Sequence, residues 1–155
     1  MALPNNDPIY SKAGDIQSGQ SLNSGTILGP TANTSTDGTG NCYPIFQSDA
    51  TNGGYVQKIR FKPVASPSGP TVARIYICSA TGAFTPGTTN TATNTWLYDE
   101  ITLPTVTLSQ TAATAVWEMP CNFALPPGYR LLVSFGTSTG SAGNGWSINV
   151  VAGKY

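Results

Sequence analysis

The chain has 155 residues, no histidine, and only seven basic and seven acidic side chains, so its formal net charge is zero. Histidine is the commonest acid, base and metal ligand near neutral pH, and its absence disfavours most enzymatic mechanisms. A neutral chain with no strong basic stripe also argues against nucleic acid as a partner. Aromatic residues make up 10% of the sequence, which suffices for a packed core and argues against disorder.

Residues 1–25 are polar with scattered apolar side chains, and two early prolines disfavour a helix there. We expect an extended N-terminal arm that lies against its own domain or a neighbouring subunit, because a polar terminus frays unless it is held. Leu3, Ile9 and Tyr10 are the apolar anchors expected at that interface. The segment lacks the features of a secretory signal, and no stretch is long and apolar enough to span a bilayer, so no membrane partner is expected.

The rest of the chain reads as short strands between turns rich in Gly and Pro. We predict strands over 26–28, 42–47, 55–62, 71–79, 95–103, 106–108, 115–119, 129–135 and 146–151. Such spacing, without an amphipathic helix of convincing length, is typical of an all-β sandwich or barrel. We therefore predict one domain over 26–155, an antiparallel β-sandwich, with a jelly roll as first choice and an immunoglobulin-like sandwich as second.

Individual strands carry signals of their position. Pro44 predicts an edge position for 42–47, because proline cannot donate to a central ladder. The strand over 71–79 is apolar on both faces, which predicts a central position. Residues 80–94 are expected to form a long exposed loop at one end of the domain.

The strand over 55–62 alternates with period two, which predicts one buried and one exposed face. The apolar face consists of Tyr55, Ile59 and Phe61. The basic face consists of Lys58, Arg60 and Lys62. A row of three cations is either a solvated face or a contact surface for an acidic partner, and these three residues are candidate interface residues.

Motifs for catalysis and metal binding are weak. Residues 136–140 fit the pattern G-x-S-x-G, but a hydrolase elbow needs a following helix and a histidine. Asp99 and Glu100 are neighbours on a strand, so they point to opposite faces and cannot form a facing carboxylate pair by themselves. Asp37 and Asp49 fall in loops, which leaves a structural cation as an open alternative. We predict no catalytic residue, no metal and no cofactor.

The cysteines and exposed aromatics leave alternatives open. Cys42, Cys78 and Cys121 are far apart with no CxxC pair, which indicates either three reduced thiols or one disulfide and a free thiol. Three aromatic residues in predicted strands are either core residues or an exposed platform on which a sugar could stack: Trp96, Tyr98 and Trp146.

Two stretches in the C-terminal part of the chain resemble a known group of proteins. These are the segment LYDEITLPTVTLSQTAATAVWEMPCNFALPPGYRLLVSFGTS and the ending GWSINVVAGKY. A strand ending in ITLP, a Thr/Ser-rich link, an LPPGYRLLVS corner and a final strand led by Trp together resemble small virion proteins of tailed bacteriophages. The resemblance covers residues 97–155. It implies a capsid decoration (cement) protein or another jelly-roll virion component, located in the virion.

This resemblance sets the expected function. We expect a non-enzymatic virion structural protein that binds the major capsid protein or another virion protein and stabilises the shell. Self-association is expected because a neutral surface lacks the usual repulsion between copies, with a trimer favoured, although a soluble monomer remains open. The alternative is a carbohydrate- or receptor-binding module of a phage tail or head fibre.

Overall fold

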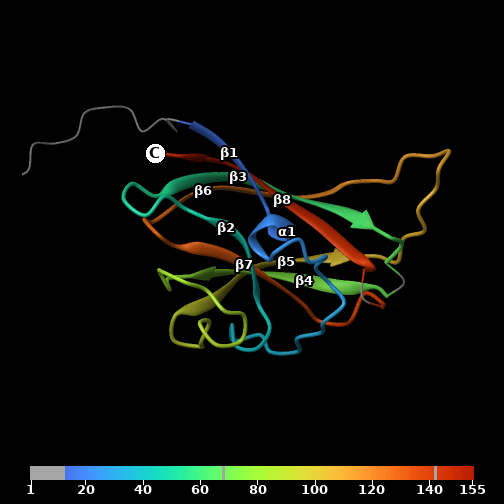
Figure 1. Cartoon of the computed structure of the whole chain (residues 1–155), viewed down its shortest axis with the longest axis horizontal. Coiled ribbons are helices and arrows are strands. Elements are labelled where there is room, and N and C mark those ends of the chain that lie inside the picture. Colours follow the sequence, from blue (N-terminus) through green and yellow to red (C-terminus); the bar gives the residue numbers. More distant parts are fainter. Residues whose placement is uncertain (1–12, 68, 142) are drawn as a thin grey trace, which may run out of the picture.

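The computed structural model describes residues 13–67, 69–141 and 143–155, and in this part of the chain strands dominate (Figure 1). The helix described there, α1, is a single turn over Gly19–Leu22. The strands are β1 (Ala13–Ser18), β2 (Tyr43–Gln47), β3 (Gly54–Val64), β4 (Thr71–Cys78), β5 (Thr95–Leu103), β6 (Trp117–Leu125), β7 (Arg130–Phe135) and β8 (Gly145–Lys154).

The strands form two antiparallel sheets of four strands each, packed together as a sandwich. The first sheet has the order β1-β8-β3-β6, and the second has the order β2-β7-β4-β5. The pairing is nested: β1 pairs with β8, β2 with β7, β3 with β6, and β4 with β5. The predicted all-β antiparallel sandwich is confirmed. The order differs from the ABED and CFG sheets of the immunoglobulin-like alternative, and the jelly-roll subtype stays a prediction.

The core lies between the sheets and consists of the inward residues that strand alternation predicts. Ile59 and Phe61 of β3, Leu131 and Val133 of β7, and Trp146 of β8 are fully buried. Burial of side chains of this size contributes about 1.5–3 kcal/mol each. Trp146 is therefore a core residue, and not part of an exposed platform.

The strand predicted to be central, β4, lies between β7 and β5. Its inner face supplies Ile75 to the main core, and its outer face carries Tyr76 and Cys78. Phe84 packs against this outer cluster, so the loop over 80–94 covers part of the second sheet. Most of the residues in this loop are exposed, as predicted, although Phe84 holds it against the sheet.

Arg130 of β7 is a buried charge that alternation alone does not explain. Its side chain donates hydrogen bonds to the carbonyl oxygens of Ala80 and Gly82. Its guanidinium carbon lies 5.4 Å from the centroid of the Phe84 ring. None of the ion pairs within the described ranges includes Arg130. Desolvation lowers its pKa, and the residue fastens the 80–94 loop to the sheet.

Part of the segment predicted as an arm belongs to the sandwich. Strand β1 pairs with β8 over its whole length. The Gln17 side chain accepts the backbone N–H of Gln47 at 2.9 Å and donates to the Gln47 carbonyl at 3.0 Å. It thereby joins β1 of the first sheet to β2 of the second, and residues 13–22 are part of the domain. Three predicted anchors lie outside the described residues: Leu3, Ile9 and Tyr10.

Several local predictions are corrected by irregular strand geometry. The ladder register shifts between Val56 and Lys58, so that Val56 enters the core and Tyr55 does not. Residues 26–28 contribute one isolated bridge, Leu28 to Trp146, and residues 106–108 are not a strand. The edge position predicted from Pro44 is confirmed, because β2 ends its sheet.

Candidate interaction surfaces

The basic row lies on the outer face of β3, where Glu118 of the neighbouring strand meets it. Lys58 Nζ lies 3.1 Å from Glu118 Oε2, and Arg60 Nε lies 2.8 Å from Glu118 Oε1. The hydrogen bond from Lys58 is the main cause that lowers the pKa of Glu118. Lys62 donates instead to the carbonyl oxygen of Thr114. Two of the three cations share the Glu118 carboxylate and Lys62 bonds to a neutral carbonyl, so this row keeps a net positive charge.

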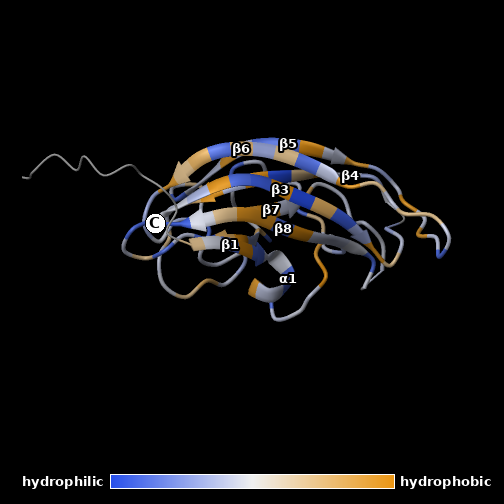
Figure 2. Cartoon of the chain, turned by 90° about the horizontal axis from the view of Figure 1, so that it is seen from above, coloured by the Kyte–Doolittle hydropathy of each residue, from blue (hydrophilic) through white to orange (hydrophobic). Residues whose placement is uncertain are grey.

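A groove of mixed apolar and polar lining lies on the outer face of the first sheet, and part of the basic row lines it together with Asn149. Ile16, Val116 and Val151 supply its aliphatic lining, and Arg60 and Lys62 stand beside them. Its volume is about 420 Å³. The register explains the arrangement, since Ile16 of β1 lies opposite Val151 of β8. Figure 2 shows hydrophilic and hydrophobic residues following one another along β3.

The edge strand β5 carries a run of exposed large side chains. Trp96 is 45% exposed, Leu97 40% and Tyr98 39%. Trp96 packs edge-on against Tyr129, with ring centroids 6.4 Å apart. Tyr98 packs against Phe123 of β6, with ring centroids 4.8 Å apart. The interpretation of Trp96 and Tyr98 as core residues is therefore wrong, because β5 ends its sheet and only part of each ring is covered.

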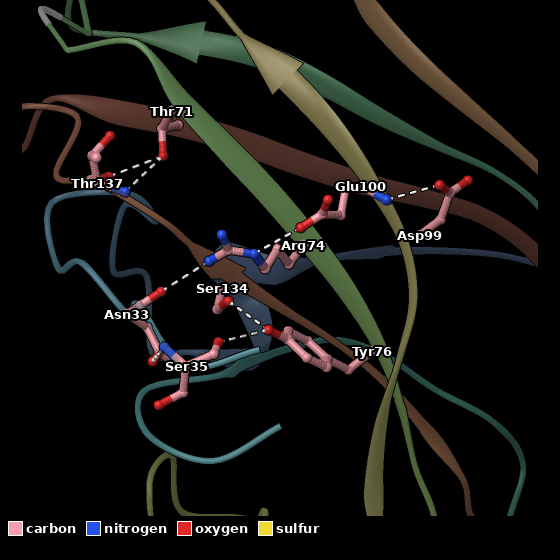
Figure 3. Close-up of polar contacts among 9 residues, drawn as sticks. All are labelled: Asn33, Ser35, Thr71, Arg74, Tyr76, Asp99, Glu100, Ser134 and Thr137. Atoms are coloured by element: carbon pink, nitrogen blue, oxygen red, sulfur yellow. Dashed lines mark hydrogen bonds and ion pairs between the residues drawn. The ribbon is translucent and has the colours of Figure 1, made fainter. Parts of the chain in front are cut away.

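A polar network holds a loop over the outer face of the second sheet (Figure 3). Arg74 Nε donates to Glu100 Oε1 at 2.8 Å, and Arg74 Nη1 donates to the Asn33 carbonyl at 3.2 Å. The Tyr76 hydroxyl donates to the Ser35 carbonyl at 3.1 Å. Glu100 thus serves an ion pair within the fold.

The acidic neighbours of β5 behave as the strand geometry predicts. Glu100 points toward Arg74, and Asp99 lies on the other side of the strand (Figure 3). Asp99 Oδ1 accepts the backbone N–H of Glu100 at 2.8 Å. The two carboxylates therefore do not face each other.

The two loop aspartates bond to their own turns. Asp37 Oδ1 accepts hydrogen bonds from the hydroxyl and amide of Thr39, which lower the pKa of Asp37. Asp49 Oδ1 accepts the amides of Asn52 and Thr51, which lower the pKa of Asp49. Across residues 13–67, 69–141 and 143–155, no group of three or more His, Cys, Asp or Glu side chains could hold a metal ion.

The G-x-S-x-G match has a different structural context from a hydrolase elbow. Residues 136–140 lie in the connection between β7 and β8, so a strand and not a helix follows the motif. The Ser138 hydroxyl donates to the Gly140 carbonyl at 3.1 Å. This geometry lacks the strand–turn–helix setting that exposes a nucleophilic serine.

All three cysteines are free thiols. Cys42 and Cys78 belong to the buried cluster on the outer face of the second sheet, and Cys121 is half-buried in β6. Desolvation raises the pKa of Cys42 to about 12 and that of Cys121 to about 11. The structure therefore has three reduced thiols and no disulfide among the three cysteines. The raised pKa values keep Cys42 and Cys121 protonated near neutral pH, so these two thiols are weak nucleophiles.

Comparisons with known proteins add no relative. No protein-family model matches the chain, and neither a curated protein nor a solved structure matches it. In the described part of the chain, none of the helical structure is long and apolar enough to cross a membrane.

Sequence reasoning missed one feature of these surfaces and left another open. The pairing of Glu118 with the basic row depends on the register between β3 and β6, which brings Arg60 opposite Glu118. The exposure of Trp96 depends on β5 being an edge strand. The available signal was the lack of period-two alternation at the start of 95–103, where the large side chains of Trp96, Leu97 and Tyr98 follow one another.

Proposed function

We propose that this chain is a jelly-roll structural protein of a tailed-phage virion, and that it binds the capsid shell as a decoration (cement) protein. The observation that supports this most is the nested pairing of β1 with β8, β2 with β7, β3 with β6 and β4 with β5. A chain folded as one long hairpin and then wrapped into two sheets has this pairing, and eight-stranded jelly rolls recur in viral capsid proteins.

The surfaces supply contacts suited to such a role without any catalytic step. A cement protein needs a rigid body and area for contact with the major capsid protein or another virion protein. We assign the shell contact to the apolar anchors Leu3, Ile9 and Tyr10, which precede β1 in the sequence. The basic row of Lys58, Arg60 and Lys62 is the second proposed interface, because it keeps excess positive charge at the surface.

The shell contact is tested on particles assembled without the protein. Purified protein is added, unbound protein is removed, and the temperature of genome release is measured with a dye that fluoresces on DNA. We expect bound protein to raise that temperature. Serine at Leu3, Ile9 and Tyr10 together should abolish binding, whereas the control Leu108→Ser, at an exposed loop leucine, should not. Absence of both binding and a temperature shift would contradict the proposal.

A second candidate function is recognition of a carbohydrate or receptor at a tail or head fibre. The exposed rings of Trp96 and Tyr98 favour it, because aromatic faces stack on sugars and jelly rolls also occur in lectins. Titration with a panel of host-surface glycans would detect it. Binding that is lost in Trp96→Ala and retained in Leu108→Ala would favour this function over the cement role.

A further inference from the structure

Exposed large apolar side chains gather on two separate surfaces of the described chain. The first, which we term the β5 edge, is the exposed rim of β5, with Trp96 and Asp99 on one side of the strand, Leu97 and Glu100 on the other, and Tyr98 at the register shift between them. The second, which we term the basic face, consists of Ile16, Arg60, Lys62, Val116 and Val151. Solvent-exposed apolar side chains that cluster with charged neighbours mark sites of protein contact.

The two surfaces are complementary in charge. The β5 edge has two carboxylates, and Arg74 pairs with one of them. Asp99 forms no ion pair among the described residues, where its hydrogen bond is to a backbone amide. The basic face belongs to the row of Lys58, Arg60 and Lys62, in which Glu118 pairs with the first two and Lys62 bonds to the Thr114 carbonyl. The Arg60 side chain is 47% exposed. The charge excess is therefore negative on one surface and positive on the other.

The two surfaces are also complementary in shape and chemistry. Trp96 stands 45% exposed at the β5 edge. The groove of the basic face has a volume of about 420 Å³ and is lined by three aliphatic side chains, by Arg60 and Lys62, and by Asn149. An indole ring suits such a groove, because its face attracts Arg and Lys while its edge packs on aliphatic side chains.

A symmetric contact between two β5 edges is disfavoured by the same residues. Asp99 is the middle residue of β5, which spans Thr95–Leu103. Full antiparallel pairing of two such strands about a twofold axis would place Asp99 opposite its own copy, and like charges directly opposite are destabilising. The register shift at Tyr98 also interrupts the edge that such a partner would pair with.

We propose that the β5 edge of one copy docks on the basic face of a second copy. The contact is heterologous, joining two different surfaces, so repetition closes a ring when the rotation allows it. The contact between copies does not require attachment to a shell, so its success or failure is separate from that of the proposed function.

The apolar part of the contact is tested with two leucines of similar exposure. Leu97 of the β5 edge is 40% exposed, and Leu108, outside both surfaces, is 36% exposed. The full chain and the variants Leu97→Ser and Leu108→Ser are compared by analytical ultracentrifugation at about 50 µM. We expect a ring-sized species for the full chain and for Leu108→Ser, and monomer for Leu97→Ser. A monomeric full chain, or equal assembly of both variants, would overturn the proposal.

The charged part is tested by reversal and restoration. Arg60→Glu and Asp99→Arg should each shift the protein to monomer, and the double variant should recover assembly because the charges again oppose. Circular dichroism and a melting curve establish that each variant is folded. Failure of the folded double variant to assemble, with both single variants monomeric, would overturn the pairing of these surfaces.

Discussion

Replacement of Arg130 by methionine should destabilise the protein strongly, although the side chain has no acidic partner among the described residues. Arg130 is 3% exposed and bonds to two loop carbonyls while lying over Phe84. Hydrogen bonds to a charged group contribute about 1.5–3 kcal/mol each, and a partly desolvated cation–π contact adds roughly 1 kcal/mol. The methionine variant no longer pays for desolvation of a charged group, which offsets part of this loss. We therefore expect a net loss of about 2–4 kcal/mol.

The assay is reversible urea unfolding followed by tryptophan fluorescence. A loss of this size corresponds to a melting point lower by about 5–15 °C for a domain of this length. Arg130→Lys keeps the charge but loses the guanidinium fork that reaches two carbonyls. Its stability should therefore lie between that of the wild type and that of Arg130→Met. Lys154→Met, at a lysine whose side chain is 41% exposed and which lies outside both proposed contact surfaces, is the control and should change little. A loss below about 1 kcal/mol for Arg130→Met would refute the reasoning.

Three further predictions concern other parts of the fold. Gln17→Leu removes both hydrogen bonds to Gln47, and should cost about 1–2 kcal/mol and speed hydrogen exchange in β1; unchanged exchange there would contradict the bridging role. Because the folded-state pKa of Asp49 lies below its usual 3.8, its stabilising effect is present above that value and is lost as pH falls through the folded pKa. Between pH 5 and 2, the melting point of Asp49→Asn should therefore fall less than that of the wild type. An equal fall of the melting point in both proteins would contradict a stabilising role of the Asp49 carboxylate. With a pKa of about 12 for Cys42 and about 11 for Cys121, iodoacetamide at pH 8 should label the native protein slowly and the urea-unfolded protein quickly; fast native labelling would be inconsistent with burial.

The sandwich could be predicted because its strands are long enough to show alternation. Ile59 and Phe61 are buried as the period-two pattern requires, and Pro44 marks an edge strand. The pattern fails at Tyr55, because a bulge near residue 57 resets which side chains face inward. A bulge depends on how two strands pair, and that pairing is not visible in the sequence of one strand.

The surfaces were less predictable than the core, because they depend on which strands become neighbours. Lys58 and Arg60 were recognisable as an outward row, whereas their shared partner Glu118 lies 58 residues away from Arg60 and meets it only through sheet register. Arg130 was hidden for a similar reason, since a loop from earlier in the chain covers the outer face of its strand. Long-range pairing, more than local pattern, decides these sites.

The central claim is that the protein covers a phage shell in many copies, and copy number tests it most directly. Quantitative mass spectrometry of purified particles, with isotope-labelled peptides of this chain and of the major capsid protein, gives the ratio of the two. The account predicts one copy for every one to few capsid subunits. A handful of copies per particle would contradict the decoration role and favour a tail or fibre, and complete absence would refute a place in the virion.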